Sequence, residues 1–179
     1  MACCFRYDWE LKESLSGGGC EDMAGVIEKI FITSRGGEPM RAIAEVEAVE
    51  GRGLQGDRYL ERTGYWTAVD ECQVTLIAGE DLDEITSTSP LRVLNGEHRR
   101  NLVTRGIDLI NLLGQRFQIG EAVLTYDRPR PPCTYIQGLT GQQGLTQALG
   151  RRGGICVRVV KSGRIRLQDP IIILNNSQP

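Results

Sequence analysis

Most of this chain consists of short apolar segments that are separated by glycine, proline and polar turn residues. Residues 42–49 alternate small apolar residues with glutamates, and Glu45 and Glu47 fall on one face at a period of two. Alanine and glutamate also favour helices, but a period of two favours a half-buried strand, which we predict here. Similar segments predict further strands at residues 26–32, 73–77, 101–103, 116–119, 122–126, 155–160, 164–167 and 171–174.

Helical segments are few and short. Residues 79–85 follow a predicted strand, and residues 144–149 end at Gly150, which is a typical C-terminal stop. Many short strands, close turns and few helices are typical of a barrel-like fold. We therefore predict a mainly β (α+β) protein with one domain at residues 25–174, because no linker or internal repeat divides the chain.

The two ends of the chain differ from the predicted domain. Residues 1–24 contain half of the cysteines and a run of three glycines, without a consistent periodicity, so we predict a poorly ordered N-terminal tail. Residues 175–179 form the C-terminal tail. No signal peptide is visible, and no apolar segment approaches the roughly 20 residues that span a bilayer. We therefore expect a cytoplasmic protein that does not act at membranes.

The charged residues exclude one class of partner. The formal net charge of the 179 residues is −2, which argues against a nucleic-acid binder that works by bulk charge. The lysines are Lys12, Lys29 and Lys161, so 18 of the 21 basic residues are arginines. The guanidinium fork holds phosphate or carboxylate with two bonds, which favours an anionic ligand. A GC-rich codon usage explains the same bias equally well.

The six cysteines do not follow the spacing of a metal site. They form no C-x-x-C pair, and His98 is the one histidine, so we expect no structural zinc. In a cytoplasmic protein we expect reduced thiols, most of which are inert packing residues.

The segment that leads to Cys133 is the most informative for chemistry. Three of the four residues at positions 129–132 are prolines, which fix a stiff, extended backbone that cannot join a ladder and that holds the cysteine in place. Arg128 and Arg130 just upstream favour the thiolate, which is the nucleophile and the metal ligand. A helix that begins at Thr134 would act in the same direction. The alternative is a structural cysteine beside a rigid turn.

A second group of candidate residues runs from His98 to Asn101. The consecutive arginines Arg99 and Arg100 precede a predicted strand, where a guanidinium can face a ligand. His98 is either a proton carrier near neutral pH or a structural residue. Asn101 either hydrogen-bonds a heterocycle or closes a turn.

A third group lies at residues 53–59, where glycines permit a close approach of the backbone to a ligand. Their spacing matches neither a dinucleotide fingerprint nor a P-loop. Arg58 either contacts a ligand or pairs structurally with Asp57.

These groups occur in an order that is similar to a known family. The matching segments are Gly53-Leu54-Gln55-Gly56-Asp57-Arg58, Val74-Thr75-Leu76-Ile77 with Glu80, Arg99 to Leu109, Phe117 to Leu124, Pro131-Pro132-Cys133, and Gly153 to Val160 with Gly163 and Ile165. Together they resemble the MOSC domain, which is named for the C-terminal domain of molybdenum cofactor sulfurases. The resemblance covers residues 25–174, and the order of the segments makes it specific although each segment alone is weak.

The resemblance implies a mixed β-barrel with a few short helices, similar to the pyruvate-kinase β-barrel. It also implies binding of a molybdenum–pterin cofactor or transfer of its sulfur, and the family is further associated with pyridoxal phosphate. Cys133 is implied to carry sulfur as a persulfide or to ligate molybdenum, both of which need a thiolate. Because the phosphate of the cofactor is anionic, the candidate cofactor-binding residues are Arg58, Arg99, Arg100, Asn101, Arg128 and Arg130.

The chain also departs from the family pattern. Tyr59 stands where a histidine usually follows the Gly-Asp-Arg segment, so we expect no proton relay there. The sequence contains neither a cysteine desulfurase domain nor a ferredoxin-like cluster motif, so a separate desulfurase or electron-transfer protein is the expected partner. Two alternatives stay open beside sulfur carriage: a molybdenum-dependent reductase of N-hydroxylated compounds, and a non-catalytic pterin-binding or chaperone module.

Overall fold

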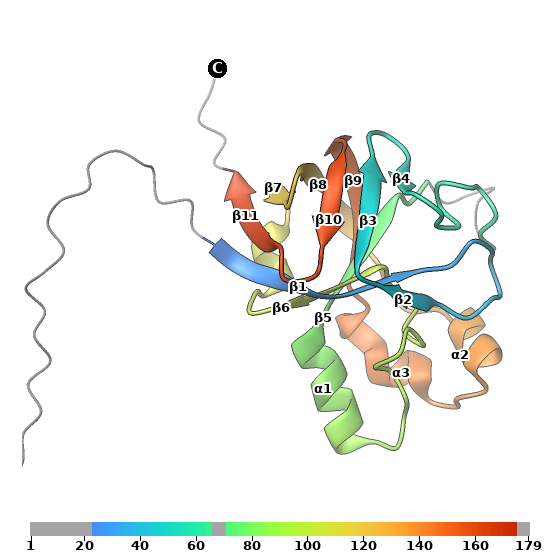
Figure 1. The fold of residues 1–179 in the computed structure, drawn as a ribbon. Helices are drawn as coiled ribbons and strands as arrows, with labels where there is room; N and C mark the ends of the chain where they lie inside the picture. The colour runs from blue at the N-terminus through green and yellow to red at the C-terminus, as the bar shows by residue number, and fades with distance from the viewer. Residues whose placement is uncertain (1–22, 66–70, 175–179) are drawn as a thin grey trace, which may run out of the picture.

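Seven strands close into a β-barrel in the computed structural model, which describes residues 23–65 and 71–174 (Figure 1). Neighbouring strands follow one another around the barrel in the order β11 (Pro170–Leu174), β7 (Arg116–Ile119), β8 (Ala122–Pro129), β9 (Ile155–Lys161), β5 (Val74–Ala78), β6 (Leu102–Arg105) and β1 (Met23–Ile32). Strand β1 then pairs with β11 and closes the circle. The β5–β6 pair is parallel and the other pairs are antiparallel, which confirms the predicted mixed barrel.

The segment predicted as a single strand at residues 42–49 is two strands that belong to different sheets. Strand β2 (Arg41–Ile43) pairs with β1, whereas β3 (Glu45–Val49) pairs with β10 (Gly163–Arg166) and β4 (Gly53–Leu54) in a smaller sheet. The period of two is confirmed within β3, whose alternate residues Val46 and Ala48 are buried. The single-strand prediction was wrong because alternation marks the inward face of a strand but does not identify its partner.

The helices gather at one end of the barrel (Figure 1). Helix α1 (Gly79–Thr88) follows β5 directly, and α2 (Thr134–Thr140) and α3 (Leu145–Leu149) follow β8. Two short 3-10 helices, η1 (Leu109–Leu112) and η2 (Gly150–Arg152), complete the elements of the described residues. The predicted helices at residues 79–85 and 144–149 are confirmed. Gly150 ends α3 with a positive φ of 42°, as its position predicted.

Successive residues of the strands supply two separate apolar cores. Ile30, Leu76 and Leu102 point into the barrel and are completely buried there. Their neighbours Ile77 and Val103 point outward, where they pack against apolar residues of the three α-helices. Because side chains alternate across a strand, the same segments fill the barrel and anchor the helices. Each fully buried side chain of this size contributes about 1.5–3 kcal/mol relative to exposure.

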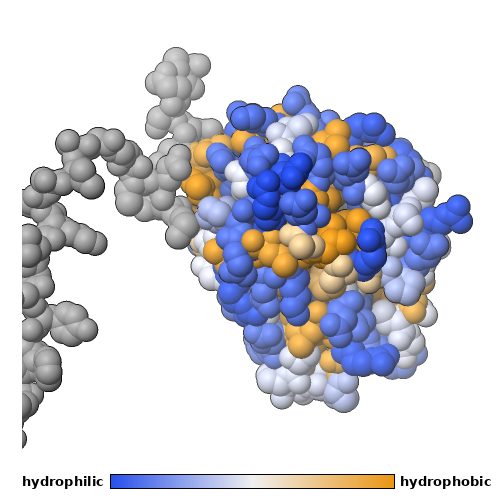
Figure 2. All heavy atoms as spheres, viewed as in Figure 1, coloured by the Kyte–Doolittle hydropathy of each residue, from blue (hydrophilic) through white to orange (hydrophobic). Residues whose placement is uncertain are grey.

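A surface hollow of about 430 Å³ lies where β1, β2 and β3 meet. Its lining combines apolar side chains with charged ones, and Arg164 lies 3.7 Å from Glu45 across it. Figure 2 shows apolar residues gathered across the middle of this view of the molecule, with hydrophilic residues around them. None of the residues predicted to bind a cofactor lines this hollow.

The first described strand begins at Met23, two residues before the predicted start of the domain, and β11 ends at Leu174, where the domain was predicted to end. Most of the predicted N-terminal tail and all of the C-terminal tail lie outside the described residues. No helix among residues 23–65 and 71–174 is long and apolar enough to cross a membrane.

Candidate functional site

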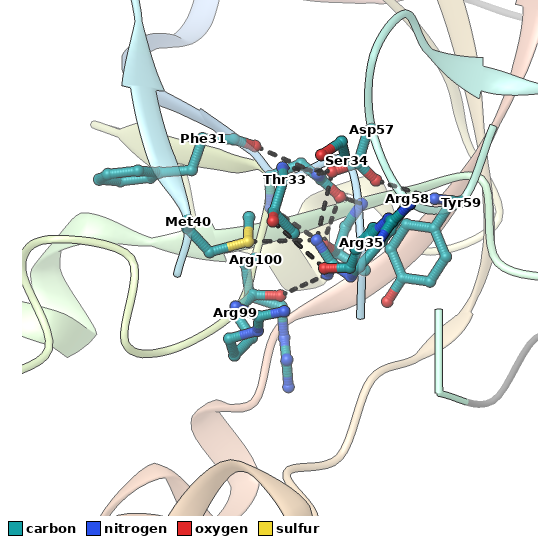
Figure 3. Close-up of polar contacts among 12 residues, drawn as sticks. Phe31, Thr33, Ser34, Arg35, Met40, Asp57, Arg58, Tyr59, Arg99 and Arg100 are labelled. Atoms are coloured by element: carbon teal, nitrogen blue, oxygen red, sulfur yellow. Dashed lines mark hydrogen bonds and ion pairs between the residues drawn. The ribbon is translucent and has the colours of Figure 1, made fainter. Parts of the chain in front are cut away.

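Asp57 is a completely buried carboxylate at the centre of the candidate site (Figure 3). It accepts hydrogen bonds from the backbone N–H groups of Thr33 and Tyr59, at 3.2 and 3.1 Å. It also accepts one from Nδ2 of Asn101 at 3.0 Å and pairs with Arg58 at 3.2 Å. Two of these donors are local, but Thr33 and Asn101 come from distant parts of the chain, so Asp57 holds the segment of residues 53–59 against the barrel.

Asn101 has a partner in the protein for each polar atom of its side chain. Oδ1 accepts from the backbone N–H of Thr75 at 3.1 Å and from its Oγ1 at 2.8 Å. Nδ2 donates to the carbonyl oxygen of Phe31 at 3.2 Å and to Asp57. The amide therefore uses both acceptor positions and both donor hydrogens within the fold, and it joins β5, β1 and the Asp57 segment.

Arg58 is buried and engaged in the same way. Its Nη1 lies 3.1 Å from Sδ of Met40, its Nη2 donates to the carbonyl oxygen of Arg99 at 3.0 Å, and its guanidinium lies 4.4 Å above the ring of Tyr59 (Figure 3). Arg99 has a positive φ of 63°, which is uncommon for a residue with a side chain. Its side chain donates to the carbonyl oxygen of Glu38 and lines a cavity of about 230 Å³. Arg99 therefore reaches this cavity, whereas Arg58, Arg100 and Asn101 do not line it.

Arg100 ties three loop carbonyls together. It donates to the carbonyl oxygens of Gly153 at 2.6 Å, His98 at 3.1 Å and Arg130 at 3.1 Å. Burial lowers the pKa of Arg99 and of Arg100 to about 10, so both stay protonated at neutral pH. Among the residues that the structure describes, neither of them forms an ion pair. A buried charge without a counter-charge is costly, and an anion in contact with the cluster would offset that cost.

The backbone that carries Cys133 is held against the start of β9. A Cβ atom added to Gly153 would overlap the carbonyl oxygen of Arg130 and lie 2.8 Å from Cδ of Pro132, so only glycine permits this approach. Pro129 was predicted to stand outside a ladder, but it lies in β8 opposite Ile155, at the last position of the strand. A proline can end a strand because it lacks a donor but still accepts.

Cys133 is the residue directly before α2, which begins at Thr134, the position that the sequence analysis considered for a helix start. It is partly buried, and its side chain packs against the apolar core between the barrel and the helices. Its carbonyl oxygen accepts from the backbone N–H of Ile136 at 3.2 Å and from Oγ1 of Thr146 at 3.1 Å. These bonds fix the backbone at Cys133, and the residue as a whole is only partly buried.

The two arginines upstream of Cys133 have different surroundings. Arg130 donates to the hydroxyl oxygen of Tyr59 at 3.1 Å and so joins the Asp57 cluster. Arg128 pairs with Asp127, a carboxylate that also binds Arg158 at 3.1 Å on the outside of the barrel. The structure therefore brings Arg58, Arg99, Arg100, Asn101 and Arg130 into one network, whereas Arg128 pairs on the strand surface.

The sequence did not point to Tyr59 as a partner of two arginines. Arg58 stacks on its ring and Arg130 binds its hydroxyl group, and burial raises the pKa of this hydroxyl above its usual value of 10.0. The phenol is therefore protonated at neutral pH. The available signal was the tyrosine at a position where the family usually has a histidine, and this position is one where an aromatic ring contacts two cations.

His98 is completely buried, and burial lowers its pKa to about 3. Its Nδ1 accepts from the backbone N–H of Arg100 at 2.9 Å, so the neutral ring carries its hydrogen on Nε2. Nε2 has no partner among the described residues, and the ring meets Phe31 edge-to-face. The ring is neutral at physiological pH, which favours the structural interpretation over the proton carrier.

Comparison with known proteins identifies a family and several solved structures that are similar to this chain. Residues 63–172 match the model of the MOSC domain family. The YuaD protein of Bacillus subtilis is 19% identical with a TM-score of 0.69 over 83% of this chain and 94% of that one. YiiM of Escherichia coli is 19% identical with a TM-score of 0.60 over 86% of this chain and 72% of that one. YiiM of Geobacillus stearothermophilus is 17% identical with the same TM-score over 86% of this chain and 74% of that one. These structures share the fold, and no curated protein matches the chain. The family match covers more than half of the sequence, and the chain belongs to the MOSC domain family.

Proposed function

We propose that this protein binds a molybdenum–pterin cofactor and uses Cys133 either to ligate the molybdenum or to carry its sulfur. Membership of the MOSC family supports a function related to the molybdenum cofactor in general. The observation that carries the more specific proposal is the buried arginine cluster. Arg99 and Arg100 have no ion pair in the described part of the chain, and Arg100 contacts the segment that leads to Cys133.

The residues present fit a ligand that combines a phosphate with a metal centre. Arg99 reaches a cavity, and guanidinium groups bind phosphate oxygens with two parallel hydrogen bonds. Arg58, Arg100 and Asn101 are engaged with the protein, so we assign them to positioning Arg99 and the Cys133 segment. Arg130 joins these two parts of the site, because its side chain donates to the hydroxyl oxygen of Tyr59 and its carbonyl oxygen accepts from Arg100.

The proposed role of Cys133 requires the loss of its thiol proton. A thiolate is both the metal ligand and the group that accepts sulfur. When it is bound, the cofactor would supply a molybdenum centre for sulfur transfer or two-electron chemistry. The protein supplies a fixed sulfur and a cationic wall, and a separate protein would supply sulfur or electrons.

Anaerobic purification of the protein from cells that make the cofactor tests this proposal. Molybdenum is measured by mass spectrometry, pterin by its fluorescence after oxidation, and persulfide by alkylation and peptide mapping. Loss of molybdenum in Cys133→Ala with retention of pterin supports ligation, and a persulfide on Cys133 supports sulfur carriage. Pterin in both proteins, with no persulfide, supports the carrier module. Absence of pterin, molybdenum and persulfide from the native protein would overturn the proposal.

The arginine cluster is tested with a matched pair of variants. Arg99→Ala removes a guanidinium that lines the cavity, whereas Arg151→Ala removes one from an exposed position on η2. We expect less bound pterin in Arg99→Ala and an unchanged content in Arg151→Ala. Equal pterin content in the two variants would contradict the assignment of Arg99.

A further inference from the structure

Two cysteines outside the candidate site face one another inside the barrel wall. Sγ of Cys72 lies 2.8 Å from Sγ of Cys156, and both residues are thiols in the structure. The separation is shorter than an ordinary contact between non-bonded sulfur atoms and about 0.8 Å longer than a covalent S–S bond. Cys72 is 4% exposed and Cys156 is completely buried.

The strands around this pair fix its geometry. Cys156 lies on β9, opposite Thr75 of β5 on one side and opposite Arg128 of β8 on the other. Cys72 precedes β5 by two residues, and its Sγ lies 3.6 Å from the carbonyl oxygen of Val74. Cys156 is held in β9 and Cys72 stands two residues before β5, and the 2.8 Å between the sulfurs means that a disulfide requires only a small movement of these atoms.

A cavity gives one of the two sulfurs a route to small molecules. The cavity has a volume of about 330 Å³, and Cys72 lines it together with Tyr59, Gln73, Arg52 and Arg158. Cys156 lies behind Cys72 and does not line the cavity. An oxidant that enters therefore meets Cys72 first, and Cys156 is placed to react in a second step.

We propose that Cys72 and Cys156 are a redox-active pair that closes to a disulfide when hydrogen peroxide or a similarly small peroxide enters this cavity. The Cys72 thiolate attacks one peroxide oxygen, the O–O bond breaks, and a sulfenic acid forms while hydroxide leaves as water. The Cys156 thiolate then attacks the Cys72 sulfur, the S–S bond forms, and a second hydroxide leaves as water. The pair loses two electrons and two protons, and the peroxide is reduced to two molecules of water.

The disulfide would be placed next to the proposed cofactor site without being part of it. Cys156 follows the Gly153–Gly154 turn by two residues, and that turn accepts the hydrogen bond from Arg100. Tyr59 shares the cavity with Cys72 and binds Arg130. Formation of the disulfide would therefore alter the backbone of β9 and the residues around Tyr59 that contact the arginine cluster. The inference does not depend on the identity of the ligand or on the role of Cys133.

Peptide mapping of the full-length protein tests this inference directly. The reduced protein is treated with hydrogen peroxide, its remaining thiols are alkylated in denaturant, and it is digested with trypsin without reduction. Trypsin places Cys72 in residues 63–92, Cys156 in residues 153–158 and Cys133 in residues 117–151. We expect a covalent link between residues 63–92 and 153–158 that disappears with dithiothreitol. Alkylation of both Cys72 and Cys156 after oxidation, or a link from Cys72 to Cys133, would overturn the proposal.

Two variants test the order of the proposed steps and the identity of the cysteines that form the disulfide. In Cys156→Ser, we expect dimedone to trap a sulfenic acid on Cys72, because the second thiol is missing. In Cys133→Ser, which retains both buried cysteines, we expect the same disulfide as in the native protein. Failure of Cys133→Ser to form it would contradict the assignment even if Cys156→Ser does not fold.

Discussion

Substitution of Asn101 provides a quantitative test of the hydrogen bonds that hold the site together. Substitution by alanine leaves the backbone N–H of Thr75, the carbonyl oxygen of Phe31 and the carboxylate of Asp57 each without one partner. All of these contacts are in the interior, where Asn101, Thr75 and Asp57 are completely buried. A buried polar group that loses its partner costs about 1–3 kcal/mol.

Three such losses predict a decrease of about 3–9 kcal/mol in the free energy of unfolding. This decrease is a large fraction of the roughly 5–15 kcal/mol that a domain of this kind has. Urea denaturation followed by far-UV circular dichroism measures it, with equal slopes required for the two proteins.

Asn111→Ala is the matched control, because Asn111 is exposed on η1. We expect this control to stay within about 0.5 kcal/mol of the native protein. A loss of less than about 1 kcal/mol in Asn101→Ala, at an unchanged slope, would refute the conclusion that this amide bridges β5, β1 and the Asp57 segment.

Three further outcomes are expected. Gly153→Ala should lower the free energy of unfolding by about 1–3 kcal/mol, because the added methyl group overpacks against Arg130, and it should also lower the pterin content. A thermal melt and the pterin assay detect these effects, and an unchanged melting temperature would refute the close approach of the two backbones. His98 has a folded pKa of about 3 and an unfolded one of 6.5, so the unfolded state takes up the proton first and stability falls as pH drops below 6.5. At pH 5 the free energy of unfolding should be lower by about 2 kcal/mol in the native protein, and His98→Gln should not show this decrease. An equal pH dependence of the two proteins in urea denaturation would contradict this prediction. Peroxide should raise the melting temperature of the native protein by several degrees through the new cross-link, reversibly with dithiothreitol, and leave Cys72→Ser unchanged.

The sequence predicted the barrel because its evidence is local. Alternation in β3 and the apolar segment of β5 are properties of consecutive residues, and the structure confirms both. The partner of each strand is not local, which is why residues 42–49 were predicted as one strand although they serve two sheets.

The same distinction applies to the candidate site. Arg58 and Arg100 were identified from their residue type, and the sequence offered Asp57 as a partner of Arg58, but other partners of both arginines lie far away in the sequence. Arg100 binds the carbonyl oxygen of a residue 53 positions further on, and Tyr59 meets a guanidinium 71 positions away. A pattern of residue types shows that a cation is present, whereas its burial and its acceptors depend on the closed fold. Gly153 and Tyr59 were therefore not predicted as parts of the site.

The pairing of β1 with β11 has a consequence for the order of events during synthesis. These are the first and last described strands, and Met23 lies opposite Ile172. The barrel cannot close on the ribosome until β11 has emerged, so the first residues of β1 and one edge of β7 remain unpaired until then. Such edges promote association between chains. A partner or chaperone that shields these edges during translation would raise the yield of soluble protein without touching the finished site.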